Sequence, residues 1–140
     1  TVEGTKEIEW DGVDEEFRAE IESQLPDGEE FLVCSEDRAD ERLRDTIKDS
    51  VWAFTTEFLA CHLDGIEYSA IRKVQGLCED ANPFLLAVLE QQGHLEQFIS
   101  DAVKSDGRGH FLAGYDGNET EIRVDVGDGH ALYVFAYRRD

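Results

Sequence analysis

Carboxylates dominate the chemistry that this sequence offers, and they gather toward its N-terminus. Residues 7–30 contain eleven acids and a single base, Arg18. Carboxylates held along a rigid surface imitate nucleic-acid phosphates and gain the salt-dependent attraction of a cationic groove. We therefore expect a surface that binds the basic groove of a nucleic-acid-binding protein. Its candidate residues lie on two expected helices: Asp14, Glu15, Glu16, Glu20 and Glu22 on the first, and Asp37, Asp40, Glu41 and Asp45 on the second.

The same acidity also fits plain solubility and halophilic adaptation, and the sequence leaves both open. The 140 residues include 33 acids and 13 bases, for a formal net charge of -20. Such a charge keeps a protein soluble and separates its copies. Nine arginines against four lysines are also typical of a halophile-adapted protein with a structural or housekeeping role. Direct binding of nucleic acid is disfavoured, because the field of the whole molecule repels polyanions.

Two histidines in the C-terminal third offer a different chemistry. His110 and His130, with Asp116 or Asp128 nearby, are ligand types found in zinc and iron sites. Their spacing matches no metal motif, so a metal-dependent enzyme is only an alternative hypothesis. We predict no catalytic residue, no metal ligand and no cofactor. The two acids with the most apolar neighbours, at positions 57 and 67, are expected to face water.

Glycines recur between residues 106 and 118, and two interpretations of them compete. Gly107 and Gly109, with Arg108 between them, could form a nest, in which successive backbone N–H groups bind an anion. The stretch lacks the lysine of a phosphate-binding P-loop and the spacing of a dinucleotide-binding motif. We expect instead a chain reversal from helix to sheet, in which glycine supplies positive φ angles.

The cysteine pattern and the hydropathy indicate a reducing compartment. Cys34, Cys61 and Cys78 are odd in number and form no CxxC pair, which argues against a disulfide framework. Cys61 and Cys78 lie in apolar helical patterns and are expected to be buried. No apolar run approaches the roughly 18 residues of a membrane span, and no signal-peptide pattern is present. We expect a cytoplasmic protein.

Apolar periodicity predicts helices in the first hundred residues. Val13, Phe17, Ile21 and Leu25 recur every four residues and indicate a helix over 14–25. A short extended segment is expected to end at Trp10, and residues 31–34 form either a strand or a buried connector. Asn82 is expected to cap a helix at its N-terminus, with the following proline in the first turn. The remaining expected helices cover about 36–63, 67–78, 82–93 and 95–104.

The C-terminal third has the pattern of strands. Charged and apolar residues alternate over 120–126, as in a half-buried strand, and the pattern over 126–130 predicts a tight hairpin turn. The strand expected at 131–138 is apolar on both faces and should be central. A further strand is expected at 110–113.

These elements predict an α+β fold with about five helices followed by a small C-terminal antiparallel β-sheet. We expect a single acidic domain over 1–140. Residues 1–50 form its strongly anionic region, with 18 acids and 6 bases. Residues 51–105 form a helical core, and residues 106–140 form the β-sheet region.

The C-terminal run GRGHFLAGYDGNE over 107–119, with YVFAYR over 133–138, resembles the tail of small uncharacterised proteins encoded by bacteriophages and prophages. The resemblance covers roughly residues 95–139 and implies a phage or mobile-element origin, with no catalytic role to carry over. In charge and size the chain also resembles, as a class, the DNA-mimic inhibitors of host defence nucleases. That resemblance implies an anti-CRISPR or antirestriction protein that blocks a CRISPR effector or a restriction nuclease in the host cytoplasm.

Overall fold

The computed structural model describes residues 6–140, and its internal contacts divide the chain into two compact units. Residues 6–43 and 108–140 form the first, which we call the sheet unit. Residues 44–107 form the second, which we call the helical unit. The border at 107 lies close to the composition change expected at 105, whereas the border at 43 precedes the change expected at 50.

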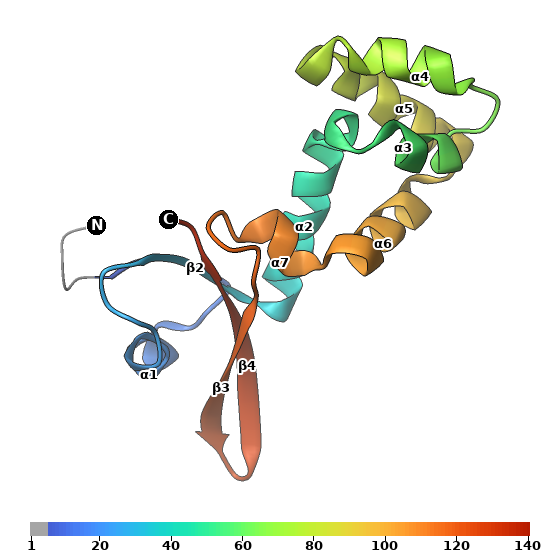
Figure 1. The fold of residues 1–140 in the computed structure, drawn as a ribbon. Helices are drawn as coiled ribbons and strands as arrows, with labels where there is room; N and C mark the ends of the chain where they lie inside the picture. The colour runs from blue at the N-terminus through green and yellow to red at the C-terminus, as the bar shows by residue number, and fades with distance from the viewer. Residues whose placement is uncertain (1–5) are drawn as a thin grey trace. The chain divides into compact units, whose positions relative to one another are not determined.

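The sheet unit is built on four strands in the order β1-β2-β4-β3 (Figure 1). β2 runs parallel to β1, and β4 runs antiparallel to both β2 and β3. The strands are β1 (Glu7–Asp11), β2 (Glu30–Ser35), β3 (Thr120–Gly127) and β4 (His130–Arg138). The helices are α1 (Glu15–Ser23), the first half of α2 (Glu36–Asp49) and the short α7 (Arg108–Leu112).

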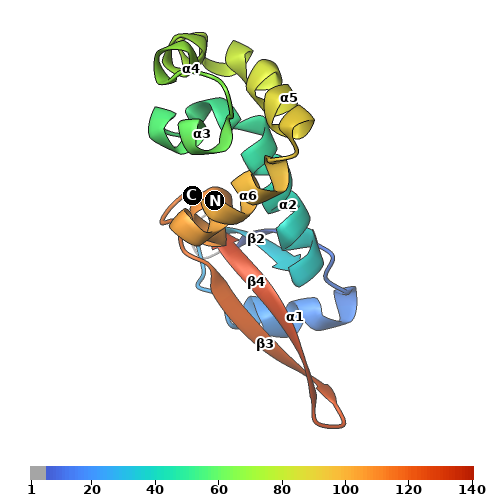
Figure 2. The ribbon, with the colours of Figure 1, turned by 90° about the vertical axis from the view of Figure 1, so that its right-hand side faces the viewer.

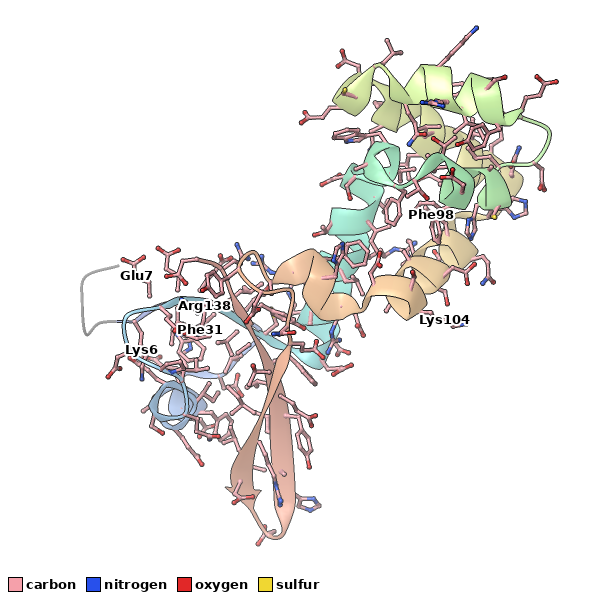
Figure 3. All side chains as sticks on the ribbon, viewed as in Figure 1. Lys6, Glu7, Phe31, Phe98, Lys104 and Arg138 are labelled. Carbon is pink, nitrogen blue, oxygen red and sulfur yellow. The ribbon has the colours of Figure 1, made fainter. Side chains whose placement is uncertain are left out.

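The broad α+β class is confirmed, but the sheet differs from the one expected. It is not confined to the C-terminus, because β1 and β2 contribute half of it. Phe31 of β2 pairs with Arg138 of β4, and these two residues lie side by side in Figure 3. A pairing across more than a hundred residues leaves no local signal in the sequence. The central position expected for the last strand is confirmed.

One face of the sheet is apolar and is covered by α1, which crosses the strands (Figure 2). Ile21 of α1 is fully buried against this face, and Phe17 packs beside it. The expected helical spacing is therefore confirmed, because it turns one side of α1 toward the core. The buried strand residues of this cluster are Phe31, Val33, Ile122, Val124, Val134 and Ala136.

The opposite face of the sheet mixes apolar and charged residues. Phe135 and Tyr137 of β4 are buried there, beside Cys34 of β2. Arg38 from α2 and Arg108 from α7 reach this face, because they contact Asp11 and the ring of Phe135, respectively. The first half of α2 and α7 thus lie against the face opposite α1.

The helical unit packs around aromatic residues. Phe98 of α6 is fully buried (Figure 3), and its ring meets Phe54, just before α3, and Phe58 of α3 at centroid distances of 4.9 and 5.1 Å. The elements of this unit are the second half of α2, the 3₁₀ turn η1 (Val51–Ala53), α3 (Thr56–His62), α4 (Tyr68–Gln75), the 3₁₀ turn η2 (Cys78–Ala81), α5 (Asn82–Gln92) and α6 (Leu95–Asp106). Within residues 6–140 no helix is long and apolar enough to cross a membrane.

The single helix expected over 36–63 is wrong, because the chain breaks between α2 and α3. The break is held by side chains from distant helices. Asn82 accepts a hydrogen bond from the Trp52 N–H at 3.1 Å and donates one to the Lys48 carbonyl at 2.7 Å. Gln75 donates to the carbonyls of Trp52 and Phe54. These bonds satisfy backbone groups that a continuous helix would have paired internally. Asn82 consequently belongs to α5 and does not cap it.

The strand expected at 110–113 is also wrong, since residues 108–112 form α7. Gly109 lies in this helix, and a Cβ atom there would stand 2.5 Å from the Gly117 carbonyl oxygen. The glycine is thus required for close approach of two backbone segments. The chain reversal expected in this stretch is present, with positive φ angles at Gly107 and Gly117.

The expected burial of two cysteines is wrong as well. Cys61 and Cys78 are exposed, and Cys34 is the buried one. Burial raises the pKa of the Cys34 thiol to about 11, so this group behaves as a small apolar side chain.

The break between α2 and α3 yields a first prediction. Asn82→Ala removes the hydrogen-bond partner of the Trp52 N–H and of the Lys48 carbonyl, and both of these bonds are half-buried. We expect the free energy of unfolding to fall by about 2 kcal/mol. Urea unfolding followed by tryptophan fluorescence measures this change. Asn118→Ala, at an exposed position, is the matched control, and equal effects of the two variants would contradict the assigned role of Asn82.

Candidate functional site

All five acids expected on the first helix are exposed on α1 or at its N-terminal cap. Helical geometry places Glu15 and Glu22 on one flank of the outer surface, and Glu16 and Glu20 on the other. The small side chain of Ala19 lies between the two flanks. Because α1 buries its opposite side on the sheet, these carboxylates are held on a fixed scaffold. We call Glu15, Glu16, Glu20 and Glu22, with Asp14, the α1 carboxylates.

No salt bridge within residues 6–140 neutralises the α1 carboxylates. Arg18, the base on this helix, points inward. Its Nη2 donates to the Val13 carbonyl at 3.1 Å, and its guanidinium lies 5.4 Å from the centroid of the Trp10 ring. The α1 carboxylates are therefore exposed without a salt-bridge partner in the described residues, although Lys6 donates to the backbone carbonyl of Glu22 at the end of the helix.

Helix stability does not account for these acids. Glu15 and Glu16 lie in the first turn, where the helix dipole favours negative charge. Glu20 and Glu22 lie near the C-terminal end, where the dipole opposes them; the last turn itself holds no base, and Lys6 from outside the helix donates to the Glu22 carbonyl. Glu16 and Glu20 also repel each other at i,i+4 spacing, which costs a few tenths of a kcal/mol. α1 keeps a charge pattern that its own stability does not require.

The acids expected on the second helix are in a different situation. Asp40 pairs with Arg108 at 2.7 Å, and Glu41 pairs with Arg38. Asp37 and Asp45 are exposed and form no salt bridge within the described residues. Asp45 belongs to the helical unit, and the other three belong to the sheet unit.

The structure therefore does not gather the nine predicted residues on one helix-lined surface. Within the sheet unit, α1 and the first half of α2 lie against opposite faces of the sheet. Among the nine, only the α1 carboxylates form a group that is exposed, free of salt bridges in the described part of the chain and carried by one rigid element.

Sequence reasoning missed the role of Arg108 at the centre of an ionic cluster. Its Nε lies 2.5 Å from Glu119, and its Nη1 lies 3.2 Å from Glu36. Its guanidinium stands 4.5 Å from the centroid of the Phe135 ring, and only 12% of its side chain is exposed. Arg108 thus joins α2, α7 and the sheet, and it is not available to a phosphate group as a nest would require.

Glu119 has a second partner in this cluster. It accepts a hydrogen bond from the hydroxyl of Tyr137, a fully buried residue of β4. Burial and this bond raise the pKa of the Tyr137 hydroxyl. The hydroxyl therefore stays protonated and serves as a structural donor.

A second cluster anchors α2 to the edge strand β1. Asp11 accepts from Arg38 Nε at 2.8 Å and from Arg42 Nε at 2.5 Å. Arg42 also reaches Glu9 at 2.5 Å. Hydrogen bonds from Arg42 and Arg38 hold the pKa of the Asp11 carboxyl below its usual range. Asp11 and Glu9 of β1 are thus paired within the fold, in contrast to the acids of α1.

The alternative chemistries find no assembled site in the described residues. His110 is exposed on α7, and His130 is the first residue of β4, next to the hairpin turn. Within residues 6–140, no group of three or more histidine, cysteine or acidic side chains is arranged to hold a metal ion. Glu57 and Glu67 both face water, as expected, and the pKa of Glu57 is lowered by hydrogen bonds from its own backbone and from Tyr68.

The Asp11 cluster predicts a pH-dependent stability. The lowered pKa means that the contribution of Asp11 is complete above about pH 4 and is lost as the pH falls through the pKa of the folded state. We expect Asp11→Asn to reduce the free energy of unfolding by about 1–2 kcal/mol at pH 7. The difference from the wild type should shrink steadily below about pH 4. Urea unfolding at pH 7 and at low pH measures both effects.

Glu41→Gln is the matched control, since it removes an exposed partner of the same Arg38. We expect it to change stability by less than about 0.5 kcal/mol at either pH. A loss as large as that of Asp11→Asn would show that Arg38 alone, and not the bridged pair of arginines, matters.

Comparison of the chain with known proteins found no matching family model, curated protein or solved structure.

Proposed function

We propose that this protein is a non-enzymatic inhibitor that occupies the basic groove of a nucleic-acid-binding protein. The α1 carboxylates take the place of nucleic-acid phosphates. The observation that carries the proposal is their state: they are exposed, free of salt bridges within the described residues, and partly opposed by the dipole of their own helix. Charge that does not serve the fold is available to a partner.

The physical mechanism is competition. A cationic groove releases counterions when fixed negative charges enter it, whether these are phosphates or carboxylates. A rigid helix brings its charges without the entropy loss of ordering a flexible acidic tail. Binding would therefore exclude nucleic acid by both charge and volume, and no chemical step is needed.

The class of partner is inferred from the resemblance of the C-terminal run to phage-encoded proteins. A host defence protein, either a CRISPR effector or a restriction nuclease in the host cytoplasm, is a target with the required basic groove. On α2, Asp37 is exposed and without a salt bridge in the described residues, but α2 lies against the sheet face opposite α1, so Asp37 falls outside the proposed contact. Asp40 and Glu41 are less suited to binding, because each would have to leave an arginine first.

The proposal predicts that neutralising α1 weakens capture of the partner. The test variant carries Glu→Gln at positions 15, 16, 20 and 22. The immobilised protein is exposed to a nuclease-treated lysate of a phage host and is eluted with a salt gradient. We expect the wild type to retain a DNA-binding protein that a DNA duplex displaces, and the variant to bind it at least about tenfold more weakly with a flatter salt dependence.

The matched control changes the net charge equally within the helical unit. It carries Asp49→Asn, Glu67→Gln, Glu90→Gln and Asp106→Asn, all at exposed positions without a salt bridge in the described residues. We expect it to bind like the wild type. Equal loss in both variants would show that only the overall charge matters, and failure of DNA to compete would exclude occupation of the groove.

Halophilic adaptation is the competing hypothesis, and it makes a separate prediction. A fold adapted to high salt loosens at low ionic strength, where its charges repel each other unscreened. Thermal unfolding in 0.1 M and about 2 M KCl measures this effect. We expect the midpoint to shift little for the inhibitor proposed here, because arginines already neutralise the acids that face the sheet. A rise of tens of degrees in high salt would favour the halophile.

A further inference from the structure

A cavity of about 210 Å³ opens in the sheet unit at the C-terminal end of α1. Its volume is below the roughly 300–1,000 Å³ that is typical of small-molecule pockets, so it fits one long side chain better than a whole metabolite. We call it the Phe31 cavity. Its apolar and charged lining residues are Leu25, Pro26, Glu29, Phe31, Asp116 and Arg138.

The apolar part of the lining belongs to the core of the sheet unit. Leu25 and Phe31 are both members of the cluster that α1 covers. Phe31 pairs with Arg138 across β2 and β4, so the two side chains share one face of the sheet, as Figure 3 shows. The Phe31 cavity therefore opens on the same face of the sheet as α1, and an aliphatic chain entering it would pack on Leu25 and Phe31.

Two carboxylates of the lining retain room for another donor. The side chain of Glu29 is only 23% exposed, and its Oε1 lies 3.4 Å from Arg138 Nη1. This distance exceeds the roughly 2.7–2.9 Å of a charge-assisted hydrogen bond. Asp116 is exposed and forms no salt bridge within residues 6–140, although its Oδ1 accepts from the Asn118 N–H at 3.0 Å. A cationic ligand would thus improve the pairing of both acids.

Arg138 is the only base among the described residues that line the cavity, and its charge is already shared. Besides Glu29, it lies 3.3 Å from Asp140, and its guanidinium stands 3.7 Å from the centroid of the Tyr115 ring. Two carboxylates and one guanidinium leave the lining with a net negative charge, and Asp140 adds to it. An anionic ligand is therefore disfavoured.

The bases on neighbouring segments do not change this balance. Each pairs with an acid that does not line the cavity: Lys6 with Asp27, Arg123 with Asp125, and Arg139 with Glu9.

The uncharged polar groups of the lining favour a guanidinium over other cations. Gln24, Asn118 and Thr120 add amide and hydroxyl oxygens around the two carboxylates. A guanidinium has five N–H donors in a plane and is weakly hydrated, so it suits a site with many acceptors and apolar walls. A metal ion fits less well, since the described residues arrange no three metal ligands together.

We infer that the Phe31 cavity binds an arginine side chain of the protein partner. The guanidinium contacts Glu29 and Asp116, and the methylene groups pack on Leu25 and Phe31. The inference deepens the proposed function and rests on it for the identity of the partner, because grooves that bind phosphates are rich in arginine. One inserted arginine would anchor the partner beside the α1 carboxylates.

The first test needs no partner protein. Acetyl-arginine amide is titrated into the ¹⁵N-labelled protein and followed by NMR. Acetyl-citrulline amide has the same shape without the charge, and acetyl-lysine amide has the charge without the planar fork. We expect millimolar affinity for the arginine compound, at least about fivefold weaker binding of the other two, and shifts at residues 24–31 and 116–120. Equal affinity for arginine and either analogue, or shifts confined to α1, would overturn the inference.

The matching variant is Glu29→Gln with Asp116→Asn, which keeps the shapes of both side chains. We expect it to lose the preference for arginine over citrulline. Asp116→Asn alone keeps the acceptor for the Asn118 N–H and should reduce the preference at least about twofold without affecting the fold. Glu121→Gln with Asp128→Asn, at exposed positions without a salt bridge in the described residues, is the control and should keep it. An unchanged preference in both cavity variants would contradict the assigned site.

Capture of the partner from the lysate separates this inference from the proposed function. We expect the double cavity variant to bind the partner at least about threefold more weakly than its control. The variant with glutamines on α1 should lose the partner but keep the preference for arginine. Unchanged capture by the cavity variant would overturn the inference alone. Capture that is lost in the cavity variant but kept with glutamines on α1 would overturn the proposed function instead.

Discussion

This chain has thirteen lysines and arginines for thirty-three carboxylates, so most acids cannot have a cationic partner. The position of each arginine determines which acids are paired and which face solvent without a partner. Arg38 and Arg42 pair with Asp11, and Arg108 pairs with Glu36, Asp40 and Glu119. These contacts hold the mixed face of the sheet, where apolar residues of β2 and β4 lie among charged neighbours. Partly buried carboxylates without those arginines would repel one another and would lose solvation without compensation.

The unneutralised charge is consequently a product of the fold. Acids on β1 look the same in the sequence as acids on α1, yet Glu9 and Asp11 are paired and the α1 carboxylates form no salt bridge within residues 6–140. The difference comes from α2, whose arginines face β1, and from Arg18, which turns toward Trp10 and the backbone. A surface of unpaired acids can therefore be recognised only when the positions of the arginine side chains in the fold are known.

The local elements were largely predictable from the sequence, because each has a local cause. The spacing of Phe17, Ile21 and Leu25 predicted α1, and the glycines at 127 and 129 predicted the hairpin turn. The break after α2 was not predictable, since it depends on Asn82 and Gln75 from other helices. The pairing of β2 with β4 likewise depends on contacts across most of the chain. For α7, the run of glycine, histidine and phenylalanine has no helical period.

The candidate site divides in the same way. The sequence identified the acids of α1 and α2 by type, but it could not show that Arg108 reaches Asp40 across 68 positions, nor that Glu29 and Asp116 line one cavity.

The two proposed sites would also contribute differently to binding. Exposed charge acts over about a Debye length, roughly 8–10 Å, and mainly accelerates encounter. It attracts any cationic protein and therefore discriminates weakly. Contact inside a cavity acts only when shapes fit, and it mainly slows dissociation. An inhibitor that relied on α1 alone would be held by every basic protein in the cell, so a second, shape-dependent site is what selectivity for one target requires.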